Sequence, residues 1–417
     1  MYRKVLKPAT KSGIFFWNMA GSVCNAANTV LMTLIITRIC GAETAGIYSL
    51  ALAVGQIVSP VAYFEVRNFQ VSDIRHEFSF SEYHLFRLIT IIAASIFTVI
   101  WILLNGYSGE KLSTVILCCI FQLIEAYENV FQGLLQLNNR LDLSGKSFTL
   151  RVVFDTVLFW GLLILTGNFF LSLLVYTIFA GIWIFVITVP ISNHFEKVHR
   201  TSLSFIPQLV VACLPLFLTT FLMSYIISAP KYAIDEFLSP DMQTYFSILF
   251  MPASVVNLFT FVIYRLYITK MAEDWVNGNR KDFMRQVLLL LLWIALIGVA
   301  ALLVGWWIGI PFLSWFYGLP QLSAYRAELM IVLLGGIFAA TAEWFNVVFT
   351  IIRHQKILLI VNAVSAVCCF LIVRSMVRDF ALMGASLCYM ISMAVLTLVQ
   401  IIFILYFLKQ SKKGTEF

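Results

Sequence analysis

Two carboxylates stand three residues apart inside an apolar stretch of the sequence. Glu125 and Glu128 occur in FQLIEAYENVFQGLL, and this spacing places them on one face of a helix. A third acid, Glu343, occurs in a second apolar stretch, IFAATAEWFNVV. Carboxyl groups buried alone stay largely protonated near neutral pH, which suits exchange with H⁺ or Na⁺. We therefore predict that the three acids carry a coupling ion; the alternative is a structural ion pair with Arg151 or another buried cation.

Basic residues at the ends of the apolar stretches form a second candidate set. Lys and Arg at such positions often anchor a span by extending their charged ends to the membrane interface. The alternative is a cationic cavity for a phosphate group, which the planar fork of Arg binds through two hydrogen bonds. Arg151, with Asp155 at i+4 as a candidate partner, would contribute to such a cavity. The candidate phosphate-binding residues are Arg38, Arg67, Arg87, Lys231 and Arg265.

A polar stripe runs along the first apolar stretch. Its members repeat every three or four residues, so they share one helical face. Small Ser and Thr side chains alone would favour packing against another helix, whereas the two Asn favour the lining of a water-filled cavity. The predicted cavity-lining residues are Asn18, Ser22, Asn25, Thr29 and Thr33, and Thr37 continues the stripe.

Signatures of catalysis and of cofactor binding are missing from the sequence. It contains no Walker A loop, no HExxH, no GxSxG and no soluble domain bearing DxD. The eight Cys lack CxxC spacing and read as small apolar side chains. The five His fall at loops or at the ends of apolar stretches, which argues against haem ligation within the membrane. We expect neither an enzyme nor a bound metal or cofactor.

The composition explains where these polar residues must lie. Of the 417 residues, 61% are hydrophobic and 12% are charged, and the mean hydropathy is +0.92. A soluble domain has about a quarter of its residues charged, so most of this chain cannot face water. The sequence predicts a polytopic, all-α membrane protein, because the apolar stretches are continuous and do not alternate as barrel strands do.

About 20 apolar residues are needed for a helix to cross the hydrocarbon core. Applied along the chain, this length predicts twelve spans, at about 14–37, 44–66, 86–105, 112–135, 148–166, 169–190, 205–229, 242–264, 286–310, 327–352, 357–375 and 382–408.

The distribution of basic residues predicts the orientation of the spans. With the N-terminus in the cytoplasm, the cytoplasmic side holds 22 of the 28 Lys and Arg residues. Both termini are therefore predicted to be cytoplasmic. The net charge of +7 is attributed to membrane insertion and anionic lipid, and no nucleic-acid partner is expected.

Two pairs of similar segments indicate an internal duplication. GAETAGIYSL and SPDMQTYFSI share an acid at the third position, an aromatic at the eighth and Ser at the ninth. IFQLIEAYENVF and IFAATAEWFNVV share Ile-Phe, an aromatic residue and Asn-Val. The pairs relate spans one and two to seven and eight, and four to ten. Six spans in each half predict two pseudo-symmetric lobes, residues 1–200 and 201–417, a transporter architecture.

Three stretches resemble a known family. MTLIITRICGAETAGIYSLALAVGQI, FEVRNFQVSDI with SEYHLFRLIT, and APKYAIDEFLS are similar to bacterial polysaccharide flippases of the Wzx type, within the superfamily of multidrug exporters and the lipid II flippase. RNFQVSD and PKYAID are fairly specific to polysaccharide export proteins. The resemblance runs from about residue 10 to 400.

The resemblance implies a carrier of twelve helices in two six-helix lobes around a central cavity. Its substrate would be an oligosaccharide repeat unit on undecaprenyl pyrophosphate, moved from the inner to the outer leaflet of the bacterial cytoplasmic membrane by ion-coupled alternating access. The cationic cavity of the family maps by position to Arg38, Arg67, Lys231, Arg265 and Arg87. A polysaccharide polymerase and a chain-length regulator are expected as partners, besides membrane lipids.

Two other functions remain open at this point. A multidrug or metabolite exporter of the same fold would need fewer cations in its cavity and no wide lateral opening. A membrane glycan polymerase or transferase would usually need a catalytic His or a large outer loop. The short outer loops of this sequence count against that second alternative.

Overall fold

The computed structural model describes residues 10–73, 77–265, 267–354 and 356–411, and within these ranges the chain forms helices and turns but no β-strand. It divides into two compact units, Met1–Phe221 and Leu222–Phe417. The boundary falls inside α8 (Ile206–Phe237) because the start of this helix packs in the first unit, where Phe217 stacks on Phe64 with ring centroids 4.5 Å apart. The two lobes derived from the sequence remain a prediction.

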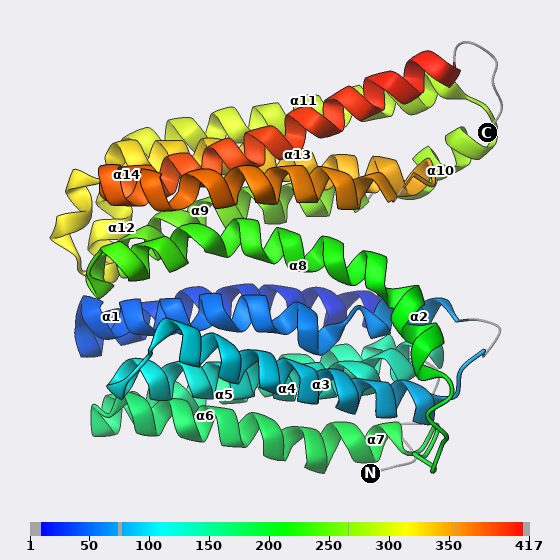
Figure 1. Cartoon of the computed structure of the whole chain (residues 1–417), viewed down its shortest axis with the longest axis horizontal. Helices are drawn as coiled ribbons and strands as arrows, with labels where there is room; N and C mark the ends of the chain where they lie inside the picture. The colour runs from blue at the N-terminus through cyan, green and yellow to red at the C-terminus, as the bar shows by residue number, and fades with distance from the viewer. Residues whose placement is uncertain (1–9, 74–76, 266, 355, 412–417) are drawn as a thin grey trace. The chain divides into compact units, whose positions relative to one another are not determined.

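In the first unit, α1 packs against α3, α4 and α5, and α6 packs against α4 and α5, so these long helices lie side by side (Figure 1). In a membrane, small side chains and interhelical polar contacts let such helices pack closely, while their remaining apolar faces can meet lipid. Before α8 the helices are α1 (Lys11–Tyr63), α2 (Val66–Ser72), α3 (Phe80–Asn105), α4 (Gly109–Leu137), α5 (Leu141–Thr166), α6 (Phe169–Trp183), η2 (Ile184–Thr188) and α7 (Val189–Ser192).

In the second unit, α13 is central and packs against α9, α11 and α14. Its contact with α9 is close, since a Cβ added at Gly336 would lie 2.7 Å from the Cβ of Ala253. The helices after α8 are α9 (Pro240–Arg265), α10 (Ile268–Val276), α11 (Arg280–Val304), η3 (Gly305–Gly309), α12 (Ile310–Tyr317), η4 (Pro320–Ala324), α13 (Arg326–Ile351) and α14 (Lys356–Ser411).

The predicted all-α membrane fold is confirmed. Among the described residues, 9 helical segments are long and apolar enough to cross a membrane. Two of them contain a sharp break: the backbone leaves helical geometry at Gly41, where φ is 89°, and at Ala381, where φ is 48°. Each break divides a segment too long for one crossing into two predicted spans. All twelve predicted spans lie on helices, the eighth on α9.

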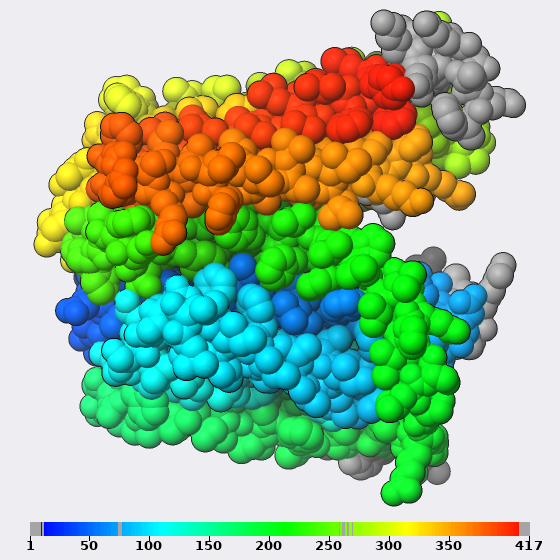
Figure 2. Space-filling model, viewed as in Figure 1, coloured from blue at the N-terminus to red at the C-terminus, as the bar shows by residue number. Residues whose placement is uncertain are grey.

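The face of α3 that points away from its neighbours is apolar. Large aliphatic side chains are exposed at i, i+4 and i+11, with Ile92 60%, Ile96 57% and Leu103 74% accessible. Figure 2 shows the sky-blue to cyan side chains of α3 over much of the visible face of the first unit. Such a surface is unfavourable in water and is typical of contact with lipid.

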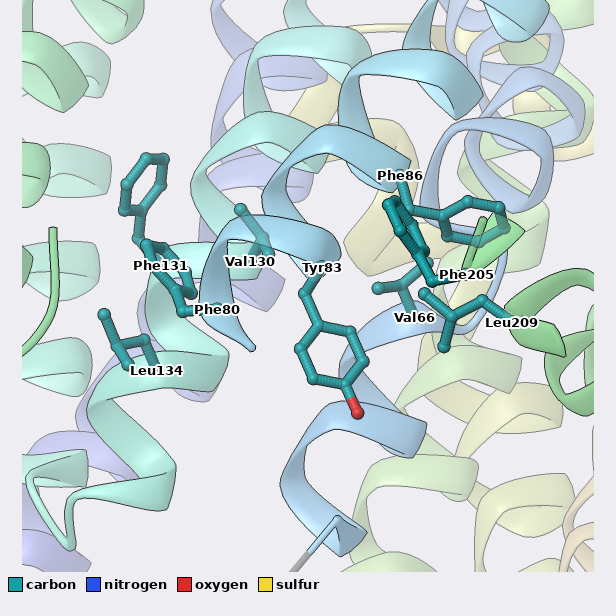
Figure 3. Close-up of a cluster of buried hydrophobic side chains, with 9 residues drawn as sticks. All are labelled: Val66, Phe80, Tyr83, Phe86, Val130, Phe131, Leu134, Phe205 and Leu209. Carbon is teal, nitrogen blue, oxygen red and sulfur yellow. The ribbon is translucent and has the colours of Figure 1, made fainter. Parts of the chain in front are cut away.

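A cluster of buried side chains joins one end of α2, α3 and α4 to the start of α8 (Figure 3). In this view Tyr83 lies between a group that includes Phe80 and Phe131 and a group that includes Val66 and Phe205. Aromatic side chains bury large areas and favour edge-to-face contacts, so the cluster packs the ends of these helices together. Gln70 of α2 also donates its side-chain N–H to the backbone oxygen of Val130 in α4 at 3.3 Å. That contact positions the candidate site described next.

Candidate functional site

A polar pocket made of two adjoining cavities lies within the first unit. The cavities measure about 290 and 340 Å³ and share Tyr63, Arg67 and Asn129 in their walls. Both volumes are near the lower end of the range for ligand pockets. The first cavity is lined by Asn18, Gly21, Ser22, Asn25, Tyr63, Arg67, Glu125, Glu128, Asn129, Gln132, Ser144, Gly145, Phe148 and Arg151. The second is lined by Tyr63, Glu65, Arg67, Asn68, Val71, Asn129 and Gln136.

One face of α4 provides most of the charged and amide groups of the pocket. Glu125, Glu128, Asn129, Gln132 and Gln136 follow one another at i, i+3, i+4, i+7 and i+11. Residues at these spacings share one helical face. The acids therefore belong to a longer polar face, which ends in amides near the C-terminus of α4.

Arg67 lies opposite the amide end of this face. Its Nη1 donates to Gln132 Oε1 at 2.9 Å and its Nη2 donates to Gln136 Oε1 at 3.0 Å. The two Gln are one helical turn apart, so their side-chain oxygens match the fork of the guanidinium. Both partners are neutral, and these contacts orient the guanidinium without neutralising its charge. Arg67 is half-buried and lines both cavities.

Arg151 lies among the acids at the other end of the pocket. Its Nη2 is 2.7 Å from Glu125 Oε1, its Nε is 3.2 Å from Glu128 Oε2, and its Nη1 is 3.4 Å from Asp155 Oδ2. We call these four residues the carboxylate cluster. With every member ionised, one positive and three negative charges give a net charge of −2. The carboxylate cluster is thus the anionic end of the pocket, while the other end holds Arg67 and, in the wall of the second cavity, Glu65.

The carboxylate cluster is held from behind by a chain of buried hydrogen bonds. Thr188 Oγ1 donates to Glu128 Oε1 at 2.9 Å and also lies 3.0 Å from Ser147 Oγ. Trp183 Nε1 donates to the same Ser147 hydroxyl at 3.1 Å. Thr188 ends the π-helix η2, which precedes Pro190, a residue without an amide donor. Single π-helical turns are frequent at functional sites.

The helices α1 and α5 approach closely beside the pocket. A Cβ added at Gly145 would lie 2.9 Å from the carbonyl carbon of Trp17 and 3.0 Å from the backbone nitrogen of Asn18. The close approach lets Asn18 Nδ2 donate to the backbone oxygen of Leu141 at 3.3 Å. Gly145 therefore sets the distance between two walls of the pocket.

The polar stripe on α1 divides into two parts with different surroundings. Asn18, Ser22 and Asn25 line the first cavity. Thr29 is exposed and does not line either cavity, whereas Thr33 is buried and its hydroxyl donates to the Thr29 carbonyl oxygen at 3.0 Å. The described surroundings thus match the cavity interpretation at one end and the packing interpretation at the other.

Of the predicted cations, Arg67 lines the polar pocket. The others lie elsewhere or, for Arg265, outside the described part of the structure. Arg38 is exposed and lies three residues before Gly41, where the helical geometry of α1 breaks. The 22 residues from Ala42 to Tyr63 span about 33 Å of helix, so Arg38 and Arg67 lie near opposite ends of the first unit. The side chain of Arg265 lies outside the described part of the structure.

Arg87 is fully buried behind the wall of the pocket. Its Nη1 donates to the Ala62 carbonyl oxygen and its Nη2 donates to Asn129 Oδ1 at 3.2 Å. The Ala62 carbonyl also accepts from Thr90 Oγ1 at 2.8 Å. This carbonyl lies at the end of α1, where it has no following helical turn to pair with. The contacts of Arg87 therefore hold the end of α1 against α3 and α4.

Two predicted site residues lie in the second unit. Lys231 is buried, with its Nζ 5.6 Å from the centre of the Phe250 ring. Glu343 is exposed and its Oε2 accepts from Asn346 Nδ2 at 3.1 Å. The surroundings of Glu343 therefore differ from those of Glu125 and Glu128, although the two segments are similar in sequence.

Several pocket residues were not predicted from the sequence. The amides of α4 continue the helical face of Glu125 and Glu128, so extending that periodicity would have found them. No comparable local signal exists for Tyr63, Ser144 or Phe148. Within the described part of the chain, no group of three or more His, Cys, Asp and Glu side chains is placed to hold a metal ion.

No family model matches the chain. It is 20% identical over 387 residues to the capsular polysaccharide biosynthesis protein CapF of Staphylococcus aureus, and the match covers 91% of this chain and 95% of CapF. The resemblance to polysaccharide export proteins noted in the sequence is thus confirmed by a similarity that extends over nearly the whole of both chains.

Solved structures of the same fold are transporters. The chain matches the lipid II flippase MurJ in an inward closed conformation with a TM-score of 0.73 and 14% identity, covering 94% of this chain and 86% of MurJ. It matches an inward-facing multidrug resistance MATE family transporter of the MOP superfamily with a TM-score of 0.63 and 15% identity, covering 95% and 96%. At these identities the likeness shows the fold: this multi-pass membrane protein has the helical fold of MOP-superfamily transporters.

Proposed function

We propose that this protein flips undecaprenyl-pyrophosphate-linked oligosaccharide repeat units from the inner to the outer leaflet of the bacterial cytoplasmic membrane. The observation that carries the proposal is the polar pocket in a membrane-embedded unit, where Arg67 is oriented by two neutral amides. A cation placed in this way suits a diphosphate group. The similarity to CapF and the fold shared with a lipid II flippase support the same class of substrate.

In the proposed mechanism, the pyrophosphate docks at Arg67 while the adjoining sugar occupies the first cavity. Asn18, Asn25 and Asn129 offer amide groups that can donate to and accept from sugar hydroxyls. The ring of Phe148 adds an apolar wall. The polyprenyl chain stays in the lipid, so the pocket needs to enclose the polar part of the substrate alone. Both termini are cytoplasmic in this scheme, and Arg67 faces the inner leaflet.

Lys231 would be a second phosphate contact, reached at another stage of transport, because it is a buried cation in the second unit. Arg38, near the opposite end of the first unit from Arg67, would serve the outward-facing stage. Arg87 is assigned a supporting role, since its guanidinium is fully buried and bound to Ala62 and Asn129. These roles go with alternating access, in which one substrate meets different residues in succession.

Coupling to H⁺ or Na⁺ is proposed at Glu125, Glu128 and Glu343. In the carboxylate cluster the three carboxylates carry a formal charge of −3 and Arg151 offsets one of these charges. The remaining net charge of −2 favours uptake of a further cation or a proton. Binding of that ion would lessen the repulsion between the acids and an anionic substrate. No step of the scheme breaks or forms a covalent bond, and the protein acts as a carrier. A polysaccharide polymerase and a chain-length regulator would take up the flipped product.

The proposal is tested with purified protein in liposomes that contain undecaprenyl-pyrophosphate-linked N-acetylglucosamine bearing a fluorescent label. A membrane-impermeant reductant bleaches label in the outer leaflet, so flipping appears as bleaching beyond that initial fraction. Wild-type protein should give this second phase, and the Arg67→Glu variant should slow it. Bleaching equal to that of protein-free liposomes would contradict the proposal.

Two parallel measurements separate the other functions. Efflux of a radiolabelled drug from the same vesicles, without flipping of the lipid, would indicate a multidrug or metabolite exporter. Formation of a longer glycan from lipid-linked donor and acceptor would indicate a polymerase or transferase. Genes for glycosyltransferases and a polysaccharide polymerase beside this gene would further support a lipid-linked glycan as the substrate.

A further inference from the structure

The two ends of the polar pocket differ in formal charge: Arg67 and Glu65 cancel at one end, whereas the other end is negative. At one end Arg67 is paired with the neutral Gln132 and Gln136. At the other end the carboxylate cluster has a net charge of −2 when ionised. Gln132 follows Glu125 by seven residues, which is about 10 Å along α4. A ligand that fills the pocket therefore meets a cation and a carboxylate at sites separated by about that distance.

The guanidinium of Arg151 cannot serve as a second anion site for such a ligand. Its side chain is 1% exposed, and three carboxylates occupy its nitrogen atoms. The rings of Phe121 and Phe148 lie 5.6 and 5.4 Å from its central carbon and cover it further. An anionic group that entered this end would not displace these partners without leaving carboxylates buried and unpaired, which is costly.

Within the carboxylate cluster, the acid that a ligand would meet is Glu125. Its side chain is 18% exposed and lines the first cavity, whereas the side chains of Glu128 and Asp155 are 1% exposed. A carboxylate accepts hydrogen bonds from hydroxyl and amide N–H groups and donates none when ionised. It repels a second carboxylate, and the repulsion is stronger in a low-dielectric interior than in water.

We propose that this pocket selects lipid-linked glycans whose sugar next to the pyrophosphate carries no acidic group, with Glu125 as the specificity-determining residue. The inference rests on the proposed function, because it takes the pyrophosphate at Arg67 as the point from which the sugar extends. An N-acetylated or otherwise neutral hexose offers hydroxyl and amide donors to Glu125. A hexuronic acid at the same place brings its carboxylate toward that of Glu125.

The test measures binding of two probes to purified protein in nanodiscs at neutral pH. The probes are undecaprenyl-pyrophosphate-linked N-acetylglucosamine and undecaprenyl-pyrophosphate-linked glucuronic acid. Wild-type protein should bind the first at least about tenfold more tightly, which corresponds to about 1.4 kcal/mol. Glu125→Gln should reduce the preference to within about threefold, chiefly by tighter binding of the glucuronic acid probe, because the repelling charge is gone.

Two further variants control the measurement. Glu125→Asp retains the charge and should retain the preference, which separates charge from the mere removal of a side chain. Glu110→Gln neutralises an exposed acid in the first turn of the same helix and should leave the preference unchanged. The affinity of each variant for the neutral probe reports whether its pocket is intact.

The outcomes distinguish this inference from the proposed function. Equal binding of the two probes by wild-type protein overturns the inference and leaves the flippase proposal standing. A preference that persists unchanged in Glu125→Gln, with the neutral probe still bound, overturns the role of Glu125. Binding of neither probe by wild-type protein would count against the flippase proposal itself, and the inference would fall with it.

Discussion

Arg151 Nη2 lies 2.7 Å from Glu125 Oε1, although 26 residues separate them in the chain. The pair joins α4 to α5, and Glu128 and Asp155 bind the same guanidinium. A carboxylate inside a membrane is unfavourable unless it is neutralised or paired. The structure therefore contains the ion pair with Arg151 that was the alternative to ion coupling. A single Arg, however, cannot balance three acids. Pairing and coupling are compatible in this cluster.

Loss of Arg151 should destabilise the fold. Arg151→Met would leave three carboxylates without a counter-charge, and breaking a buried pair in this way typically costs about 3–5 kcal/mol. The expected result is a clearly lower midpoint of thermal unfolding. The midpoint is measured by size-exclusion chromatography of detergent-solubilised protein after heating. Arg378→Met is the control, because the pair of Arg378 with Asp379 is exposed and its loss should give no measurable shift. Equal midpoints for Arg151→Met and wild type would contradict this account.

Neutralising the proposed coupling acids should impair transport without loss of protein. Each variant is expressed singly in a strain that lacks the gene: Glu125→Gln, Glu128→Gln and Glu343→Gln. Each should reduce polymer export by about tenfold. Typical coupling free energies correspond to changes of about 5- to 150-fold. The amount of protein in the membrane serves as the control. Wild-type export by all three variants would remove the coupling role.

The charge of Arg67 should matter more than its shape if it binds pyrophosphate. Arg67→Glu should abolish export, because it places an acid where the diphosphate docks, whereas Arg67→Lys retains the charge and loses only the fork. The same comparison at Lys231, with Lys231→Glu and Lys231→Arg, tests the second unit. At each position, polymer export by the variant with reversed charge (Glu) should be well below export by the variant with the other basic residue. Similar export by reversal and exchange would instead favour an anchoring role for that residue.

Gly145 should tolerate no side chain. Gly145→Ala places a Cβ 2.9 Å from the backbone of Trp17, so α1 and α5 must move apart and the first cavity must change. We expect a loss of stability of about 1–3 kcal/mol, as for other overpacked sites. Gly161→Ala on the same helix is the matched control, since nothing lies within 4 Å of its added Cβ and Ala favours a helix. The midpoint of thermal unfolding should fall for Gly145→Ala alone; an equal midpoint in both variants would contradict the packing argument.

The features that were predictable from the sequence are local. Long apolar stretches predicted the spans, because about 20 residues must cross the hydrocarbon whatever surrounds them. The spacing of Glu125 and Glu128 predicted their common face, and that of Arg151 and Asp155 predicted a candidate pair, because helical geometry relates residues three or four apart. The same rule would have extended the face of α4 to Gln136.

The surroundings of each polar group were decided only by the tertiary structure. Asn18 and Thr33 share one stripe, yet the first lines a cavity and the second is buried. Arg67 and Arg87 are both basic residues at span ends, but one enters the pocket and the other holds the end of α1. Burial and pairing depend on residues far apart in the chain that helix packing brings together. A periodic pattern identifies which side chains share a face, and only packing determines what that face meets.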